Sequence, residues 1–268
     1  EIPLRLVGSE MCIRDSQKSE EYTMAADKSS LEKQLEDYRF ALSKVSHEVR
    51  NPVTLINSYL QLLEKDHPEL KQNELWSDIT EEMLFLRRLL DDLSCYNNTF
   101  RCQFSATEMS PFLLKLSESV YLLFPDSPIS YQISVPENLP TLSVDPLKLN
   151  QALTNLLRNS FESAAQSVSF SVVEKQDCLQ IDIINDGASI SKEQQTEFFK
   201  PFVTTKPNGT GLGLPIARGI IEAHHGSIAF LFPEETSDSK NTPDNPDKSG
   251  TLLNHMSGSH LRIVLPLC

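Results

Sequence analysis

An apolar stripe along residues 31–63 constrains the fold of this chain more than any other feature of its sequence. The spacing of three and four residues between its members indicates one face of a helix of about 33 residues, roughly 50 Å long. A second stripe, at residues 75–93, follows the break at "DHPELKQ". Together they predict an antiparallel helical hairpin, and dimerisation into a four-helix bundle is the simplest way to bury both faces. The first stripe consists of Leu31, Leu35, Tyr38, Leu42, Val45, Val49, Val53, Ile56, Leu60 and Leu63.

Composition excludes several classes of protein. The formal net charge of −13 argues against a nucleic-acid partner, which normally meets a basic face. No apolar run reaches the ~18 residues that a membrane-spanning helix needs. The five cysteines form no CxxC pair, which favours free thiols in a reducing cytoplasm. We therefore expect a cytoplasmic protein, with any membrane tether in an N-terminal region missing from this sequence.

Composition and hydrophobic pattern divide the chain into segments. Residues 1–16 fit nothing that follows and resemble translated sequencing-adapter read-through, so we expect a non-native segment there and a linker at 17–29. The helical hairpin is expected at 30–100. Residues 104–268 alternate helices with mostly antiparallel strands, which predicts an α+β sandwich. Within it, the polar, proline-rich stretch at 233–258 predicts a disordered insertion.

Local signals set the expected helices of the sandwich. One is expected from Pro111 with Ser110 as N-cap, and another from Pro146 with Asp145 as N-cap. A third begins in "GLGLPIARGIIEAHH" and is expected to close at Gly226. Strands are expected at 129–135, 168–174, 178–184, 227–232 and 260–267.

Three motifs in the sandwich could carry chemistry. The stretch "FVTTKPNGTGLGL" opens a helix with glycines, and unpaired N–H groups at a helix start bind phosphate well. Asn155 and Asn159 share a helix face and could offer oxygen ligands to Mg²⁺, although such a pair taken alone is more often two exposed polar side chains without a role. Asn185 and Gly187 follow a buried strand, where they could present a polar side chain to a flat base or form an ordinary turn. The candidate phosphate-binding residues are Thr204, Thr205, Lys206, Gly209, Gly211 and Gly213.

A fourth motif that could carry chemistry, "SHEVRNP", lies in the expected helical hairpin. His47 and Glu48 stand side by side, and Pro52 lies inside the expected helix, where proline costs roughly 3 kcal/mol. Stability does not explain this combination, which indicates a chemical role.

In the order in which they occur along the chain, the motifs resemble the catalytic core of a bacterial sensor histidine kinase of two-component signalling. "SHEVRNPVTLINSYLQLL" resembles the phosphoacceptor box, "NQALTNLLRNSFESA" the asparagine box, and "IINDGASIS" the first glycine box. "FFKPFVTTK" resembles the phenylalanine box and "GTGLGLPIARGIIEAHHGSI" the second glycine box. The short lid is most similar to nitrogen-regulation and sporulation kinases. The resemblance covers about residues 30–268.

The resemblance implies a dimeric phosphotransfer hairpin followed by a Bergerat-type ATP-binding sandwich. His47 would be the phosphoacceptor, Glu48 would accept its other ring proton, and Asn51, one helical turn on, would also position water for dephosphorylating the partner. That partner would be the receiver domain of a separate response regulator, phosphorylated on an aspartate.

For the nucleotide, the resemblance implies ATP with Mg²⁺. Asn159 would hold the metal and Asn155 would support the phosphates. The backbone of Gly211, Leu212 and Gly213 would wrap around them.

The chain departs from the family pattern at two positions. Asn185 stands where the family has an aspartate that accepts from the adenine amino group, and Ser189 replaces a glycine. An asparagine oxygen can still accept this bond if the amide is held in one orientation, so weakened ATP affinity is expected. The neighbouring Asp186 could substitute, although its side chain would point the other way.

Three other functions stay open. A stand-alone ATPase of the same superfamily would carry a water-activating glutamate where this chain has Asn155. An anti-sigma serine kinase would have no use for "SHEVRNP". A degenerate scaffold, which binds a response regulator without kinase activity, is supported only by Asn185 and Ser189.

Overall fold

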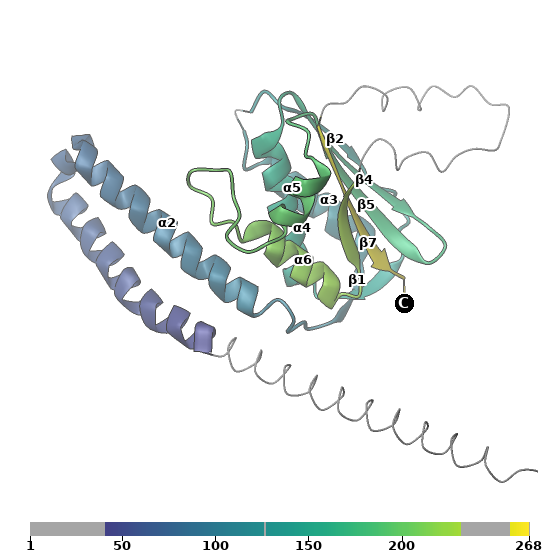
Figure 1. Cartoon of the computed structure of the whole chain (residues 1–268), viewed down its shortest axis with the longest axis horizontal. Helices are drawn as coiled ribbons and strands as arrows, with labels where there is room; N and C mark the ends of the chain where they lie inside the picture. Colours follow the sequence, from purple (N-terminus) through teal and green to yellow (C-terminus); the bar gives the residue numbers. More distant parts are fainter. Residues whose placement is uncertain (1–40, 126, 232–257, 268) are drawn as a thin grey trace, which may run out of the picture. The chain divides into compact units, whose positions relative to one another are not determined.

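The computed structural model describes residues 41–125, 127–231 and 258–267 (Figure 1). The chain divides into two compact units, with the boundary between Leu63 and Glu64. The expected segments at 1–16 and 17–29 and most of the insertion at 233–258 lie outside the described residues. The domain boundaries given above therefore stay predictions.

A helix whose described part runs from 41 to 66, uninterrupted at Pro52, makes up the described part of the first unit and continues three residues past its boundary. Serine and threonine hydroxyls along it donate to backbone carbonyls one turn earlier, as where the Ser46 hydroxyl donates to the Leu42 carbonyl over 2.8 Å. Much of the predicted apolar stripe is exposed, including Val45, Val49 and Ile56. An exposed apolar face of this length is typical of a protein–protein interface.

The second unit begins with the predicted turn and second helix. After the 3-10 helix η1 (Pro68–Gln72), helix α2 (Glu74–Asn97) starts at Asn73, whose side chain accepts from the N–H groups of Leu75 and Trp76. The indole of Trp76 donates to Glu64 over 3.4 Å. This bond links the start of α2 to the residues that precede the turn.

An α+β sandwich follows, as predicted. Its five-stranded sheet has the order β2-β4-β5-β7-β6, and helices α3, α4 and α6 cover one face (Figure 1). Only β2 and β4 pair in parallel; the other neighbours in this sheet are antiparallel. The core lies between sheet and helices, around Leu153, Phe170 and Ile216. The strands are β2 (Ser130–Ser134), β4 (Ser167–Glu174), β5 (Cys178–Asn185), β6 (Ser227–Leu231) and β7 (Ser259–Pro266), and the helices are α3 (Met109–Tyr121), α4 (Pro146–Ser163) and α6 (Gly213–Ala223).

Three short elements of the sandwich were not predicted. Strands β1 (Ser105–Glu108) and β3 (Thr141–Val144) pair with each other in a separate two-stranded sheet. Helix α5 (Lys192–Phe198) starts with a capping box, in which the Ser191 side chain and the Gln194 side chain each bond the other residue's backbone N–H.

Two predicted helix ends were wrong. Ser110 lies inside α3, and its hydroxyl instead donates to the Pro136 carbonyl and accepts from the Leu139 N–H. Helix α6 closes at His224, and the residue in the left-handed conformation is His225 (φ 59°), not Gly226. Asp145, by contrast, caps α4 as predicted, accepting from the N–H groups of Leu147 and Lys148 at 3.1 Å each.

The start of α4 is also tied to the linker after α2. The Gln103 N–H donates to the Asp145 carboxylate over 2.7 Å, and the Lys148 ammonium donates to the carbonyls of Asn98 and Thr99. On the other side, the Asp145 N–H donates to Nε2 of the buried His224 over 2.9 Å. The linker, the start of α4 and the end of α6 are thus joined around one residue.

A polar cluster lies on the sheet face that points away from the core. The Asp182 carboxylate accepts from Arg262 (2.7 Å) and Gln180 (2.7 Å), and it lies 2.9 Å from Nε2 of His260. Burial alone would raise the pKa of Asp182, but the hydrogen bonds from these three residues outweigh it and lower the pKa to about 2. The cluster joins β5, the central strand of the sheet, to its neighbour β7.

Candidate functional site

His47 lies exposed on the long helix of the first unit. Glu48 and Asn51 are exposed as well, and the Glu48 carboxylate lies 4.0 Å from the Lys44 ammonium, one helical turn away. Asn51 is four residues after His47, so both lie on the same side of the helix. The proton-accepting role of Glu48 stays a prediction.

The end of α4 brings together three polar side chains from two parts of the sequence. The Lys206 ammonium donates to the Asn159 side-chain oxygen over 3.3 Å. The same ammonium forms an ion pair with Glu162, which lies three residues after Asn159 on the same helix face. Lys206 and Asn159 were both predicted as site residues, whereas Glu162 was not. Its spacing from Asn159 was the available signal.

The segment 202–211 forms a closed loop, here called the lid. The Phe202 N–H donates to the Gly211 carbonyl over 3.1 Å, and both residues take left-handed backbone (φ 65° and 66°). A Cβ at position 211 would lie 2.6 Å from the Phe202 carbonyl carbon, so glycine is required there. Within the lid, the Thr204 hydroxyl accepts from the Lys206 N–H over 3.1 Å. Thr205 is exposed at the rim.

The lid leads directly into α6. A Cβ at Gly213 would lie 3.7 Å from the Asn159 amide nitrogen, an ordinary van der Waals distance, so the start of α6 lies beside Asn159. Leu212 is fully buried and anchors this start in the core. Asn155 lies one turn before Asn159 on α4 and is half-buried.

The lid also contacts α2 through two side chains that the sequence did not single out. The Thr210 hydroxyl donates to the Asp92 carboxylate over 2.6 Å, and the Asn208 amide donates to Glu81 over 2.6 Å. Burial raises the pKa of Asp92, and the bond from Thr210 only partly offsets this effect.

Asn185 lies buried at the end of β5, and its amide is held in one orientation. Its oxygen accepts from the Gly187 N–H over 3.0 Å, and its nitrogen lies 2.8 Å from the Ser259 hydroxyl oxygen. A backbone N–H can only donate, so the oxygen must face Gly187. A Cβ at Gly187 would lie 1.9 Å from the Ser163 carbonyl oxygen, so this turn packs directly against the last turn of α4.

Asp186 does not replace Asn185. Its carboxylate accepts from the backbone N–H groups of Ala165, Gln166 and Ser167 and from the Ser167 hydroxyl. These bonds, with that of Gln166 the largest, lower the pKa of Asp186 to about 2. The side chain thus fastens the segment after α4. Ser189 is exposed and takes no left-handed backbone, so the departure from glycine causes no strain there.

Contacts along α4 connect these groups. Asn159 contacts Lys206 and lies beside the start of α6. Ser163 lies four residues, or about 6 Å, further along the helix and packs against Gly187, close to Asn185. The predicted phosphate-binding and base-binding residues therefore gather at one end of one helix. The His47 helix belongs to the other unit.

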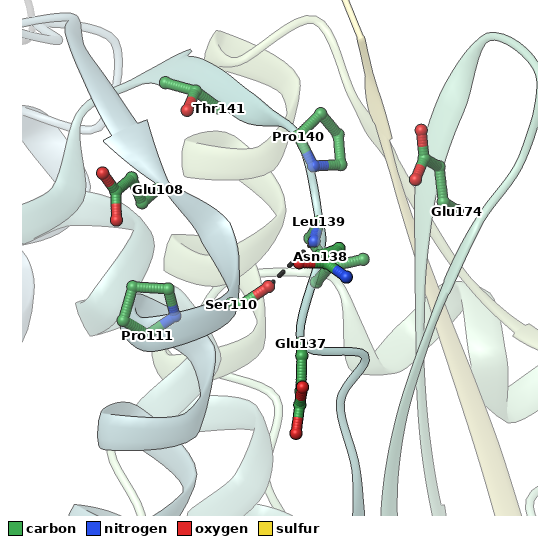
Figure 2. Close-up of a pocket in the computed structure, with 9 residues that line it drawn as sticks. All are labelled: Glu108, Ser110, Pro111, Glu137, Asn138, Leu139, Pro140, Thr141 and Glu174. Carbon is green, nitrogen blue, oxygen red and sulfur yellow. Dashed lines mark hydrogen bonds between the residues drawn. The ribbon is translucent and has the colours of Figure 1, made fainter.

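A pocket of about 390 Å³ lies elsewhere, between the start of α3 and the loop before β3 (Figure 2). Glu108, Glu137 and Glu174 line it, and the Ser110 hydroxyl is already bonded to Leu139 beside it. None of the predicted site residues lies in this pocket.

An exposed histidine on a long helix, in one chain with a glycine-closed lid over polar helix residues, suits nucleotide-dependent phosphotransfer. Two family models match the chain. Residues 38–95 match the His Kinase A (phospho-acceptor) domain, and residues 144–267 match the histidine kinase-, DNA gyrase B-, and HSP90-like ATPase family. The chain belongs to the bacterial sensor histidine kinases of two-component systems and carries their catalytic core.

Curated relatives agree with the predicted subgroup. Sporulation kinase B of Bacillus subtilis is 30% identical over 194 residues, which is 70% of this chain and 45% of that protein. The sensory histidine kinase/phosphatase NtrB of Escherichia coli O157:H7 is 29% identical over 203 residues, 69% of this chain and 56% of that protein. The chain thus spans about half the length of these relatives.

Solved structures share the fold. Full-length ShkA in complex with AMPPNP aligns with a TM-score of 0.61 at 18% identity, over 85% of this chain and 45% of that one. The histidine kinase ThkA in complex with the response regulator TrrA aligns with a TM-score of 0.57 at 19% identity, over 100% of this chain and 68% of that one. Across the part of the chain that the structure describes, no helix is long and apolar enough to cross a membrane.

Proposed function

We propose that this protein phosphorylates itself on His47 with ATP and passes the phosphoryl group to an aspartate of a separate response regulator. The observation that carries the proposal is the pairing of Asn159 with Lys206 of the glycine-closed lid, in a chain that also exposes His47. Both matching family models support it. The phosphoacceptor motif around His47 also supports the proposal.

His47 supplies the nucleophile. A neutral imidazole nitrogen attacks the γ-phosphorus of ATP, an N–P bond forms, and the P–O bond to the β-phosphate breaks as ADP leaves. The proton on the other ring nitrogen passes to a base, for which Glu48 is the candidate. In the second step the aspartate carboxylate of the regulator attacks the phosphorus, the N–P bond breaks, and the ring takes back a proton so that it leaves as neutral imidazole.

The end of α4 fits a nucleotide with Mg²⁺. The Asn159 oxygen already faces a cation, the Lys206 ammonium, and the start of α6 lies beside the same side chain. Asn159 would hold the metal with Asn155 nearby, while Lys206, Thr204 and the lid backbone would bind phosphate oxygens. Bound Mg²⁺ would neutralise phosphate charge. Asn185 would accept from the adenine amino group through the free lone pair of its fixed oxygen.

We further propose a homodimer, formed by the exposed apolar faces of the helices. A phosphatase activity toward the regulator is a second candidate, because exposed Asn51 lies one turn from His47 and could position water. The relative NtrB is named a sensory histidine kinase/phosphatase, and this similarity favours the second candidate.

Incubation with γ-labelled ATP and Mg²⁺ tests the kinase proposal. Acid-labile, alkali-stable label is expected on the wild type and on His67→Gln, the control, because His67 lies exposed at the turn before α2. No label is expected on His47→Gln. If the wild type binds nucleotide but takes up no label, the ATPase or scaffold functions replace this proposal, and released phosphate distinguishes between them.

A further inference from the structure

Lys206 has more than one role to fill. To contact phosphate, its ammonium must face the nucleotide, yet in the structure it is bonded to Asn159 and paired with Glu162. Asn159, for its part, would use the same oxygen for Mg²⁺. Binding of Mg²⁺ and ATP therefore requires the Lys206 ammonium to leave the Asn159 oxygen and to bind phosphate instead.

Glu162 determines how easily that exchange occurs. It lies on the same face of α4 as Asn159, and it is the anionic partner of Lys206. A carboxylate beside the phosphate site repels phosphate unless it is neutralised. The ion pair supplies this neutralisation, but each phosphate contact made by Lys206 has to compete with it.

We propose that Glu162 is a positioning residue of the nucleotide site, which holds Lys206 and the lid beside Asn159 and competes with the phosphates for the Lys206 ammonium. The inference rests on the proposed ATP site. It differs from a metal-ligand role for Glu162, because the two roles predict opposite effects of removing the carboxylate.

The test is calorimetric titration of the full chain with a non-hydrolysable ATP analogue and Mg²⁺. Glu162→Gln is expected to bind the analogue about two- to fivefold more tightly than the wild type. The magnitude follows from an ion pair whose two side chains are each 38% exposed, which places it in the range of surface pairs. Higher ionic strength should narrow the difference, because salt screens exposed charges.

A matched control separates this effect from net charge. Glu118 is exposed on α3, so Glu118→Gln removes the same charge from the same domain without touching the lid. Its affinity for the analogue should equal that of the wild type.

A second readout needs no nucleotide. With the ion pair removed, the lid amides at 203–210 should exchange hydrogen faster in Glu162→Gln than in the wild type or Glu118→Gln. Unchanged or weaker analogue binding by Glu162→Gln, while the wild type binds, would overturn the inference and leave the kinase proposal standing. Absence of binding by the wild type would overturn both.

Discussion

Replacing Asp182 with asparagine tests the account of the sheet. The side chain keeps its size, but the charge that accepts from Arg262 and Gln180 and lies beside His260 is lost. The usual pKa of 3.8 and the lowered value of about 2 set a ceiling of about 2.5 kcal/mol on the charge's contribution. Arg262 is one-third exposed, so solvent screening reduces the expected loss of unfolding free energy to about 1–2 kcal/mol.

The pH dependence follows from the direction of this pKa. The folded protein holds Asp182 ionised more firmly than the unfolded chain does, so the contribution is complete well above pH 3.8 and is lost as the pH falls toward 2. At pH 3 roughly half of it should remain. The stability difference between wild type and Asp182→Asn should shrink accordingly between pH 7 and pH 3.

The assay is urea unfolding of the full chain at both pH values, followed through the amide NMR signals of β5 and β7. The control is Asp177→Asn, on the exposed turn between β4 and β5. If the two variants lose the same stability, or if the Asp182→Asn loss is as large at pH 3 as at pH 7, the charge network does not stabilise the sheet as argued.

Three further predictions concern the nucleotide site and the dimer. Gly187→Ala should destabilise the protein by about 1–3 kcal/mol, because its Cβ would lie 1.9 Å from the Ser163 carbonyl oxygen, whereas Gly213→Ala, whose Cβ would make only an ordinary contact with Asn159 at 3.7 Å, should leave thermal stability nearly unchanged. Asn185→Asp should bind ATP more tightly in calorimetry, because it restores a charged acceptor for the adenine amino group; unchanged affinity would contradict that role. Ile56→Glu should shift the chain toward monomer in light scattering, while the substitution of exposed Glu118 by glutamine should not.

Much of the fold could be predicted because its signals are local. Asp145 and Pro146 indicate the start of helix α4, and alternating or continuous apolar residues indicate the long strands β4 and β5. Strands β1 and β3 could not be found this way. Each is four residues long and is stabilised by pairing with the other. The two strands are far apart in the sequence, so no pattern within either stretch indicates that they pair.

The errors at helix ends have a different cause. Ser110 has the right residue type for a cap, but a loop 26 to 29 residues away engages its hydroxyl instead. His225 takes the left-handed conformation that the sequence assigns more readily to the adjacent Gly226. In both places tertiary contacts override the local preference.

The candidate site shows the same division. Motifs identified Asn159 and Lys206 separately, but only the folded chain shows that one ammonium joins Asn159 to Glu162. The contacts of Thr210 and Asn208 with α2 were equally hidden, since they join residues more than a hundred positions apart.

The attachment of the start of α4 through its N-cap Asp145 has a mechanical consequence. Asp145 and Lys148 attach the start of the helix to the linker that follows α2, and Asn159 lies about 14 residues, or roughly 21 Å, further along the axis. A rigid rod held at one end converts angle into displacement. Each degree by which the linker tilts α4 moves Asn159 by about 0.4 Å at this length. A tilt of α4 by only a few degrees would therefore move the Asn159 oxygen by more than one ångström, with α4 as the arm between the linker and the site.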